Sequence, residues 1–136
     1  MTIPMVNLES IPVVEPKDIV AVRHAVRRQA VKINLSLVDQ TKIVTAASEL
    51  ARNMLIYGGG GEVTLEILEQ DLRRGLRATF IDKGPGIPDI SLALRDGFTT
   101  GEGMGLGLGG ARRLVNEFNI ESAPGEGTRV TITRWR

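Results

Sequence analysis

Two polar residues four positions apart, Glu49 and Asn53, lie in a segment whose apolar residues recur at helical spacing. Side chains at positions i and i+4 share one helical face, so both groups can address one ligand. The amide oxygen of Asn53 suits Mg²⁺, which takes few protein ligands beside phosphate oxygens. The Glu49 carboxylate can orient or deprotonate an attacking hydroxyl. Because such pairs are common on solvated helix faces, the spacing alone does not identify a site.

The second candidate is a carboxylate at the end of a segment in which apolar and polar residues alternate. Asp82 has the parity of Ala78 and Phe80, which predicts that it projects to the buried face. A buried carboxylate needs a partner or a ligand, and it can accept a hydrogen bond from the exocyclic amine of adenine. Gly84 and Gly86 follow, and they let the backbone approach a flat ring closely. The alternative is a turn carboxylate that caps its own loop.

The run Gly101–Gly110 is the most informative segment, because glycine alternates with other residues just before a segment of helical spacing. Exposed amides at a helix N-terminus bind phosphate, helped by the helix dipole. The run therefore predicts a lid over a phosphorylated ligand, and a mobile loop is the alternative. The cofactor-binding positions that we assign to it are Gly101, Gly103, Gly105, Leu106 and Gly107.

Other nucleotide-binding classes do not fit the sequence. Gly105-x-Gly107-x-x-Gly110 matches the dinucleotide fingerprint, but that fingerprint must follow a strand early in a βαβ unit. Here it follows a long loop, and only residues 111–136 come after it. The sequence contains neither a Gly-Lys-Ser/Thr phosphate loop nor a His-Arg-Asp catalytic loop.

The last candidate is Thr128, which follows Gly125-Glu-Gly127 at the start of a β-prone segment. Its hydroxyl can lie near the base end of a ligand. An ordinary hairpin turn explains the same local sequence equally well.

The elements that must position these residues follow from periodicity and from capping signals. Apolar spacing predicts a helix from Pro16 to Ile33 and a second one from Ser36, capped with Asp39, to the glycines at 58–61. Its apolar stripe is expected to comprise Ile43, Ala47, Leu50, Met54 and Tyr57.

Alternation predicts a hairpin of residues 63–67 and 76–81 around a turn at 71–75. A loop is expected over 82–103, a helix over 105–118 with Leu106 on its buried side, and strands at Ile120 and 128–133. A short strand at 11–14 comes first. The fold class is therefore α+β, a two-layer sandwich with helices on one face of a mixed or antiparallel sheet.

Composition limits the possible functions. The 136 residues suit one domain, 1–136, and the net charge of +1 favours neither nucleic acid nor an anionic membrane as partner. No apolar run approaches the ~18 residues that span a bilayer. The chain has no cysteine, which excludes disulfides and Cys-type zinc sites and is compatible with a reducing cytoplasm.

Taken in order, the motifs resemble the four boxes of the GHKL ATPase superfamily. The matching segments are Glu49-x-x-x-Asn53, Asp82-x-Gly84-x-Gly86, Gly103-x-Gly105-Leu-Gly107 and Gly125-x-Gly127-Thr128. The resemblance implies the Bergerat, histidine-kinase-like ATPase fold. It also implies roles for the residues: Asn53 as the Mg²⁺ ligand, Glu49 as the base and Asp82 as the adenine contact. The glycines are then lid and phosphate-loop positions, and Thr128 is a support near the base.

Within that superfamily the chain is similar to the small stand-alone serine/threonine kinases of bacterial stress signalling, the anti-sigma regulatory factor kinases. The similar phrases are Asp39-Gln40, Ser48-Glu-Leu-Ala-Arg-Asn53, Asp82-x-Gly-Pro-Gly-Ile-Pro-Asp89, Asp96-Gly-Phe98 and Glu117-Phe118. That similarity implies ATP and Mg²⁺ as cofactors, a STAS-domain protein as substrate, and activation of a PP2C-type phosphatase by the released kinase. The long, regular glycine run is nearer to the histidine-kinase form. The alternative is an anti-sigma factor that sequesters a sigma factor, with ATP as its conformational switch.

Overall fold

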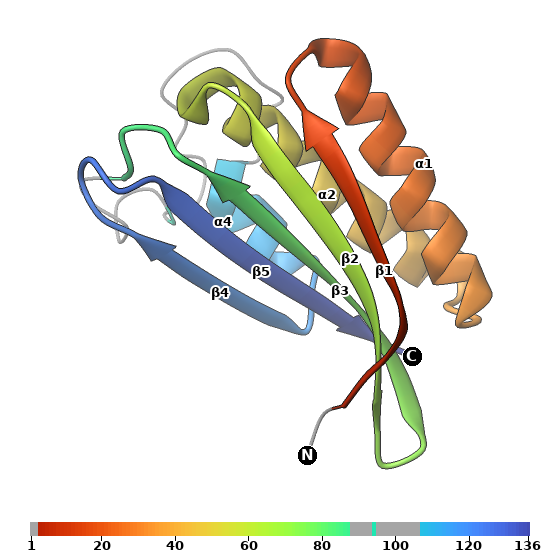
Figure 1. Cartoon of the computed structure of the whole chain (residues 1–136). Coiled ribbons are helices and arrows are strands. Elements are labelled where there is room, and N and C mark those ends of the chain that lie inside the picture. Colours follow the sequence, from red (N-terminus) through yellow and green to blue (C-terminus); the bar gives the residue numbers. More distant parts are fainter. Residues whose placement is uncertain (1–2, 88–93, 95–106) are drawn as a thin grey trace.

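The computed structural model describes residues 3–87, 94 and 107–136, with side chains from residue 8 onward. Five strands and three helices form the described part (Figure 1). In chain order they are β1 Ile3–Val13, α1 Pro16–Lys32, α2 Leu37–Gly58, β2 Gly61–Gln70, β3 Arg73–Asp82, α4 Gly107–Arg113, β4 Glu117–Ser122 and β5 Thr128–Trp135.

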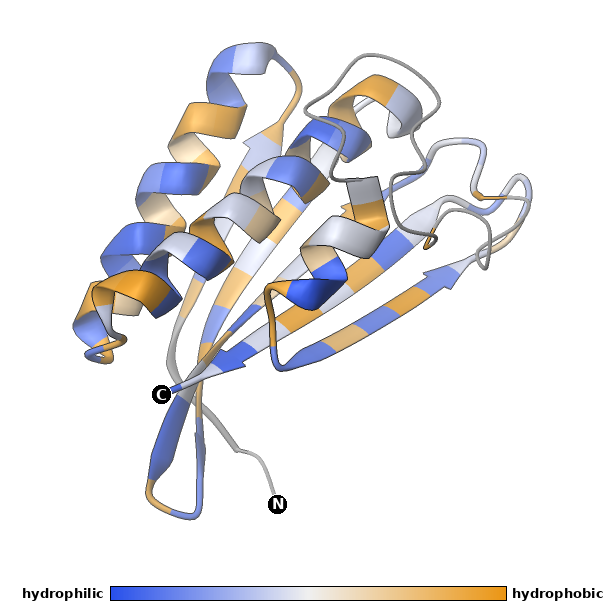
Figure 2. Cartoon of the chain, turned by 180° about the vertical axis from the view of Figure 1, so that it is seen from behind, coloured by the Kyte–Doolittle hydropathy of each residue, from blue (hydrophilic) through white to orange (hydrophobic). Residues whose placement is uncertain are grey.

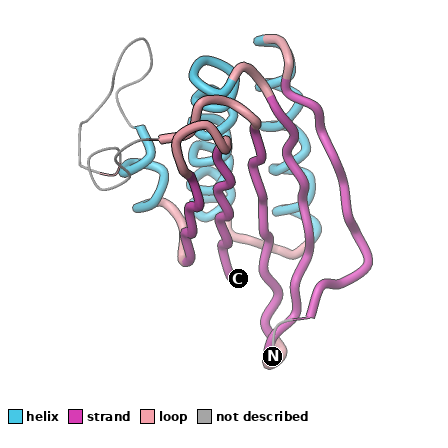
Figure 3. The backbone as a smooth tube through the Cα atoms, turned by 60° about the vertical axis from the view of Figure 1, so that its left-hand side comes forward, coloured by secondary structure: helices cyan, strands magenta, loops and turns pink. Residues whose placement is uncertain are grey.

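The strands form one sheet in the order β1-β2-β3-β5-β4, and every neighbouring pair is antiparallel. The helices of the described part lie on one face of this sheet (Figures 1 and 3). The α+β, two-layer prediction is therefore confirmed, and the sheet is antiparallel rather than mixed. Among the residues that the structure describes, no helix covers the other face of the sheet.

The core lies between the two layers and takes side chains from both. Helices α1 and α2 are amphipathic: Figure 2 shows hydrophobic and hydrophilic residues interspersed along both of them. Fully buried side chains from the two layers include Val22, Ile43, Leu65, Leu76 and Ile132. Among the described residues, no helix has both the length and the apolar character that a bilayer crossing requires.

Helix α2 begins and ends as its sequence predicts. The Ser36 hydroxyl accepts a hydrogen bond from the Asp39 amide at 3.1 Å, which caps the first turn. Gly59 ends the helix in the left-handed conformation, with φ at 74°. One residue of the predicted stripe departs from it: Tyr57 is 43% exposed. Its turn lies beside Asp82, the last residue of β3, where the core ends.

A second anchor fixes the start of α2 to the end of the sheet. Arg134 of β5 donates to an Asp39 carboxylate oxygen at 2.6 Å, and it also donates to the Leu114 carbonyl at 3.3 Å. The Arg134 guanidinium lowers the pKa of Asp39 below its usual value, because it stabilises the charged carboxylate. This pair ties α2, β5 and the segment after α4 together, far from the glycine cap at the other end of α2.

The β2–β3 hairpin has a tighter turn and longer strands than predicted. Asp71 and Leu72 take φ values of 49° and 68°, and Gln70 pairs directly with Arg73. This is the two-residue turn whose twist matches that of paired strands. Residues 73–75, expected in the turn, belong to β3.

Helix α4 is shorter than the predicted 105–118, because the sheet takes the residues after it. The Leu114 amide donates to the Ala111 carbonyl at 3.1 Å, a tight turn that ends the helix. The Asn116 amide then donates to the Thr133 carbonyl at 3.0 Å. Phe118, predicted to be helical, is therefore a strand residue of β4.

Candidate functional site

Three polar residues lie in one row at the end of the sheet where β3 finishes and β5 starts. Asp82 of β3 is opposite Thr128 of β5, and Thr128 is opposite Ser122 of β4. Strand parity places this row on the face of the buried Phe80 and Val130, which is the face that the helices cover. The register thus brings together two predicted residues, Asp82 and Thr128, and one that was not predicted, Ser122.

The Asp82 side chain lies between the end of α2 and its own loop. Its Oδ1 accepts a hydrogen bond from the Gly84 amide at 2.9 Å. A Cβ atom on Gly58 would lie 2.5 Å from the Asp82 Cγ and 2.6 Å from Oδ2, so a larger residue at that place in α2 would displace the Asp82 side chain. Asp82 is half-buried. The alternative interpretation, a turn carboxylate that caps its own loop, is therefore observed; Asp82 also has the parity of the covered face, and its contact with adenine stays a prediction.

Glycines let three backbone segments meet around this row. A Cβ on Gly84 would lie 2.6 Å from the Gly58 Cα, and one on Gly86 would lie 2.0 Å from the Ala123 carbonyl oxygen. A Cβ on Gly127, where φ is 79°, would lie 2.3 Å from the Asp82 carbonyl oxygen. The observed neighbours of these glycines are backbone atoms; close approach to a ligand ring stays a prediction.

Ser122 connects the segments that the glycines bring close. Its hydroxyl accepts from the Ile87 amide at 2.8 Å and donates to the Gly127 carbonyl at 2.9 Å. It also lies 2.8 Å from the Thr128 hydroxyl. Ser122 belongs to none of the predicted motifs, although its place opposite Thr128 across the turn at 123–127 is the signal that could have identified it.

The two residues on α2 have different surroundings. Glu49 is 5% exposed as a residue, so it does not lie on a fully solvated helix face, while Asn53 is half-buried. Within the described part of the chain, neither side chain has a hydrogen bond or an ion pair. Gly58 follows Asn53 by about 1.4 turns, which is about 7.5 Å along the helix axis. Along α2, Asn53 therefore lies between Glu49 and the Asp82 row.

Most of the glycine run falls outside the described residues, including Gly101, Gly103, Gly105 and Leu106. Gly107 is described: it begins α4 with φ at 59°. Helix α4 lies beside α2 (Figure 1), and its Leu108 and Ala111 are buried. The end of the run is therefore adjacent to the helix that carries Glu49 and Asn53.

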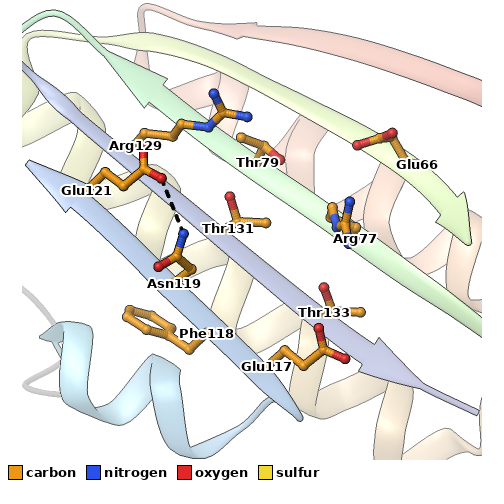
Figure 4. A pocket seen from close by; sticks show the side chains of 10 residues that line it. All are labelled: Glu66, Arg77, Thr79, Glu117, Phe118, Asn119, Glu121, Arg129, Thr131 and Thr133. Atoms are coloured by element: carbon orange, nitrogen blue, oxygen red, sulfur yellow. Dashed lines mark hydrogen bonds between the residues drawn. The ribbon is translucent and has the colours of Figure 1, made fainter. Parts of the chain in front are cut away.

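A separate shallow hollow of about 540 Å³ lies on the uncovered face of the sheet. Figure 4 shows polar side chains of β2, β3, β4 and β5 around it, with Arg77, Thr131 and Thr133 near its middle. It contains none of the predicted site residues. The described residues of the candidate site belong to the opposite, helix-covered side.

Comparison with known proteins agrees with this geometry. Residues 38–135 match the family described as histidine kinase-, DNA gyrase B-, and HSP90-like ATPases. The chain belongs to this family. The match begins at the start of α2 and ends at the end of β5, so it contains every candidate site residue.

Two proteins with known names are similar to this chain along most of their length. The serine/threonine-protein kinase RsbT of Bacillus subtilis (strain 168) is 44% identical over 118 residues, which are 87% of this chain and 89% of that protein. The anti-sigma F factor of Thermoanaerobacter sp. (strain X514) is 30% identical over 118 residues, 83% of this chain and 82% of that protein.

Part of a solved structure, that of the RsbU and RsbW domains of a Mycobacterium tuberculosis protein, has the same fold as this chain. It superposes with a TM-score of 0.67 at 23% identity, over 96% of this chain and 33% of that chain. The likeness supports the assignment of the two-layer architecture.

Proposed function

We propose that this ATPase-family chain is an ATP-dependent serine/threonine protein kinase of bacterial partner switching. Its substrate is a STAS-domain protein, and the released kinase activates a PP2C-type phosphatase by binding it in the cytoplasm. The observation that carries the proposal is the buried Glu49 on the same helix as Asn53, in a chain 44% identical to a serine/threonine-protein kinase.

The base end of the proposed ATP site is the row of Asp82 and Thr128. Asp82 uses Oδ1 for the Gly84 amide, and its Oδ2 has no hydrogen bond within the described residues. A carboxylate oxygen of this kind accepts a hydrogen bond from the exocyclic amine of adenine. The ribose and phosphates then extend along α2 toward Asn53 and Glu49, under the lid of Gly101, Gly103, Gly105, Leu106 and Gly107.

The residues present fit a magnesium ion that is held mainly by the nucleotide. Asn53 offers one half-buried amide oxygen with no hydrogen bond in the described residues. No cluster of three or more metal-binding side chains occurs in that part of the chain. Mg²⁺ commonly has few protein ligands and takes the rest from phosphate and water. When bound, it would neutralise charge on the transferring phosphoryl group.

Glu49 is the proposed base. Its carboxylate would take the proton of the substrate hydroxyl while that oxygen bonds to the γ-phosphorus and the bond to the β–γ bridging oxygen breaks. Phosphoryl transfer depends mostly on positioning and electrostatic stabilisation, so a single oriented carboxylate suffices for the proton. The backbone amides at the start of α4 would lie near the phosphates, at the end of the glycine run.

A pull-down from native lysate with and without ATP, followed by phosphosite mapping, tests the proposal. We expect a STAS-domain protein to bind, and we expect the purified chain to transfer labelled γ-phosphate to it. Glu49→Ala and Asn53→Asp should abolish transfer, whereas Tyr57→Phe, an exposed residue of the same helix, should preserve it. Unchanged transfer in both site variants would overturn the mechanism.

The similarity to an anti-sigma F factor supports a second candidate function. In that case ATP acts as a conformational switch, and the chain sequesters a sigma factor. Co-purification of a sigma factor, with no phosphoryl transfer to any STAS-domain protein, would favour this candidate over the kinase.

A further inference from the structure

We infer that Ser122 is a positioning residue that fixes the direction of the Thr128 hydroxyl, so that this hydroxyl only accepts hydrogen bonds from a bound nucleobase. The inference rests on the proposed nucleotide site and deepens it. It assigns to Ser122 a part in the choice between amino and keto purine bases.

The Ser122 oxygen is surrounded by polar groups. Three groups lie within hydrogen-bond distance: the Ile87 amide at 2.8 Å, the Gly127 carbonyl at 2.9 Å and the Thr128 hydroxyl at 2.8 Å. A serine hydroxyl has one proton to donate and two lone pairs that accept. The three contacts therefore use its full capacity.

The protons of these contacts can be assigned. The Ile87 amide can only donate and the Gly127 carbonyl can only accept, so Ser122 receives from the first and gives its one proton to the second. No proton of Ser122 is left for Thr128. In the arrangement that satisfies all three contacts at once, the short contact between the two hydroxyls is a hydrogen bond that Thr128 donates to Ser122.

The Thr128 hydroxyl keeps only part of its hydrogen-bonding capacity for a ligand. Its proton is engaged with Ser122, so its remaining lone pairs can only accept. Asp82, directly opposite on β3, also presents an acceptor, because its Oδ2 has no hydrogen bond within the described residues. The base end of the site thus offers two neighbouring acceptors on one face, and both side chains are half-buried.

Two hydrogen-bond acceptors in the site favour a nucleobase that presents a donor to them. At C6, adenine presents an amine, which donates, where hypoxanthine and guanine present a keto oxygen, which accepts. At the neighbouring N1 the polarity is the reverse, so the two acceptors discriminate between the bases where they face C6. A site of acceptors leaves polar groups unpaired against the keto bases, and unpaired half-buried groups are the strongest source of discrimination between analogues. Removing Ser122 would free the Thr128 proton, and Thr128 could then donate to the keto oxygen.

Calorimetric titration with ADP and IDP in the presence of Mg²⁺ tests this assignment, since the two nucleotides differ only at that edge of the base. We expect wild-type protein to prefer ADP. Ser122→Ala should lower the ratio of the two affinities by about fivefold to tenfold, the worth of one neutral hydrogen bond. Ser122→Thr, which keeps the hydroxyl, should retain the wild-type ratio.

A second background separates this role from general loosening of the loop. Thr128→Val removes the hydroxyl that Ser122 is proposed to orient. Adding Ser122→Ala to that variant should therefore leave the ratio of the ADP and IDP affinities unchanged. Equal weakening of both nucleotides in Ser122→Ala, with the ratio intact, would overturn the inference. The titration reads binding alone, so a chain that binds ADP but transfers no phosphate contradicts the proposed kinase and leaves the role of Ser122 standing.

Discussion

The two ends of the proposed nucleotide site differ in how far the protein satisfies its own polar groups. At the base end, Asp82, Ser122 and Thr128 are joined to each other's segments by hydrogen bonds of 2.8 to 2.9 Å. On α2, Glu49 and Asn53 have no such bonds within the described residues. The base end is therefore built before a ligand arrives, while the phosphate end keeps its polar groups available.

This difference has a physical cause in the backbone. The base end consists of strand ends and short turns, whose positions the sheet register fixes, and glycines allow the segments to touch. The phosphate end is one face of a helix, and its two polar side chains have no hydrogen-bond partner among the described residues. Groups that must bind charge in a reaction are commonly left less stabilised by the fold itself.

The largest effect should follow from breaking the base end sterically. Gly127→Ala should lower the free energy of unfolding by about 2–5 kcal/mol, because it combines left-handed strain with overpacking against the Asp82 carbonyl. Gly125→Ala is the matched control: φ is 80° there, and nothing lies within 4 Å of its Cβ. It should cost about 1–2 kcal/mol from strain alone. Equal losses of unfolding free energy in the two variants, measured by urea titration, would mean that the Asp82 carbonyl does not crowd a Cβ at position 127.

The next effect separates binding from folding at the same end. Asp82→Asn should weaken ADP binding by about tenfold to a hundredfold, as expected for losing a hydrogen bond to a charged group. The amide oxygen can still accept from the Gly84 amide, so the midpoint of urea unfolding should change little. Calorimetry and urea titration of the same sample check both statements; a large stability loss with normal ADP affinity would contradict them.

On α2 the opposite balance is expected. Glu49→Gln keeps the size of the side chain and breaks no hydrogen bond within the described residues, so the free energy of unfolding should stay within about 1 kcal/mol of wild type. Phosphoryl transfer should nevertheless be lost, since an amide cannot take the proton. A destabilised Glu49→Gln would show that the carboxylate has a structural partner and would remove the contrast between the two ends.

The smallest effect is a pH dependence at the start of α2. The Arg134 guanidinium lowers the pKa of Asp39, so the pair contributes stability above the ordinary aspartate pKa of about 3.9. That contribution is lost as the pH falls through the lowered value of the folded state. Asp39→Asn should therefore cost up to about 1 kcal/mol at neutral pH and progressively less below pH ~4.

Thermal unfolding between pH 3 and 7 would follow that difference, with Asp71→Asn in the exposed hairpin turn as the control. A difference between wild type and Asp39→Asn that is independent of pH would mean that packing, and not the ion pair, is responsible.

The sequence predicted most elements and the order of the motifs, but it placed some boundaries wrongly. Helix α2 and its caps at Ser36 and Gly59 followed from local signals, since capping depends on residues within one turn. The end of α4 did not, because pairing of Asn116 with Thr133 on a distant strand overrides the local helical spacing. The burial of Glu49 was likewise invisible, since periodicity does not say what covers a helix.

By itself, the sequence determined the α+β class, the ATPase family and the spacing of Glu49, Asn53 and Asp82, because periodicity, capping and motif order are written along the chain. Only the tertiary structure decided that Asp82, Thr128 and Ser122 form one row, because strand register joins residues about forty positions apart. It also brings the Ile87 amide, the Gly127 carbonyl and the Thr128 hydroxyl around the Ser122 oxygen, and these are the contacts from which we infer the direction of the Thr128 hydroxyl.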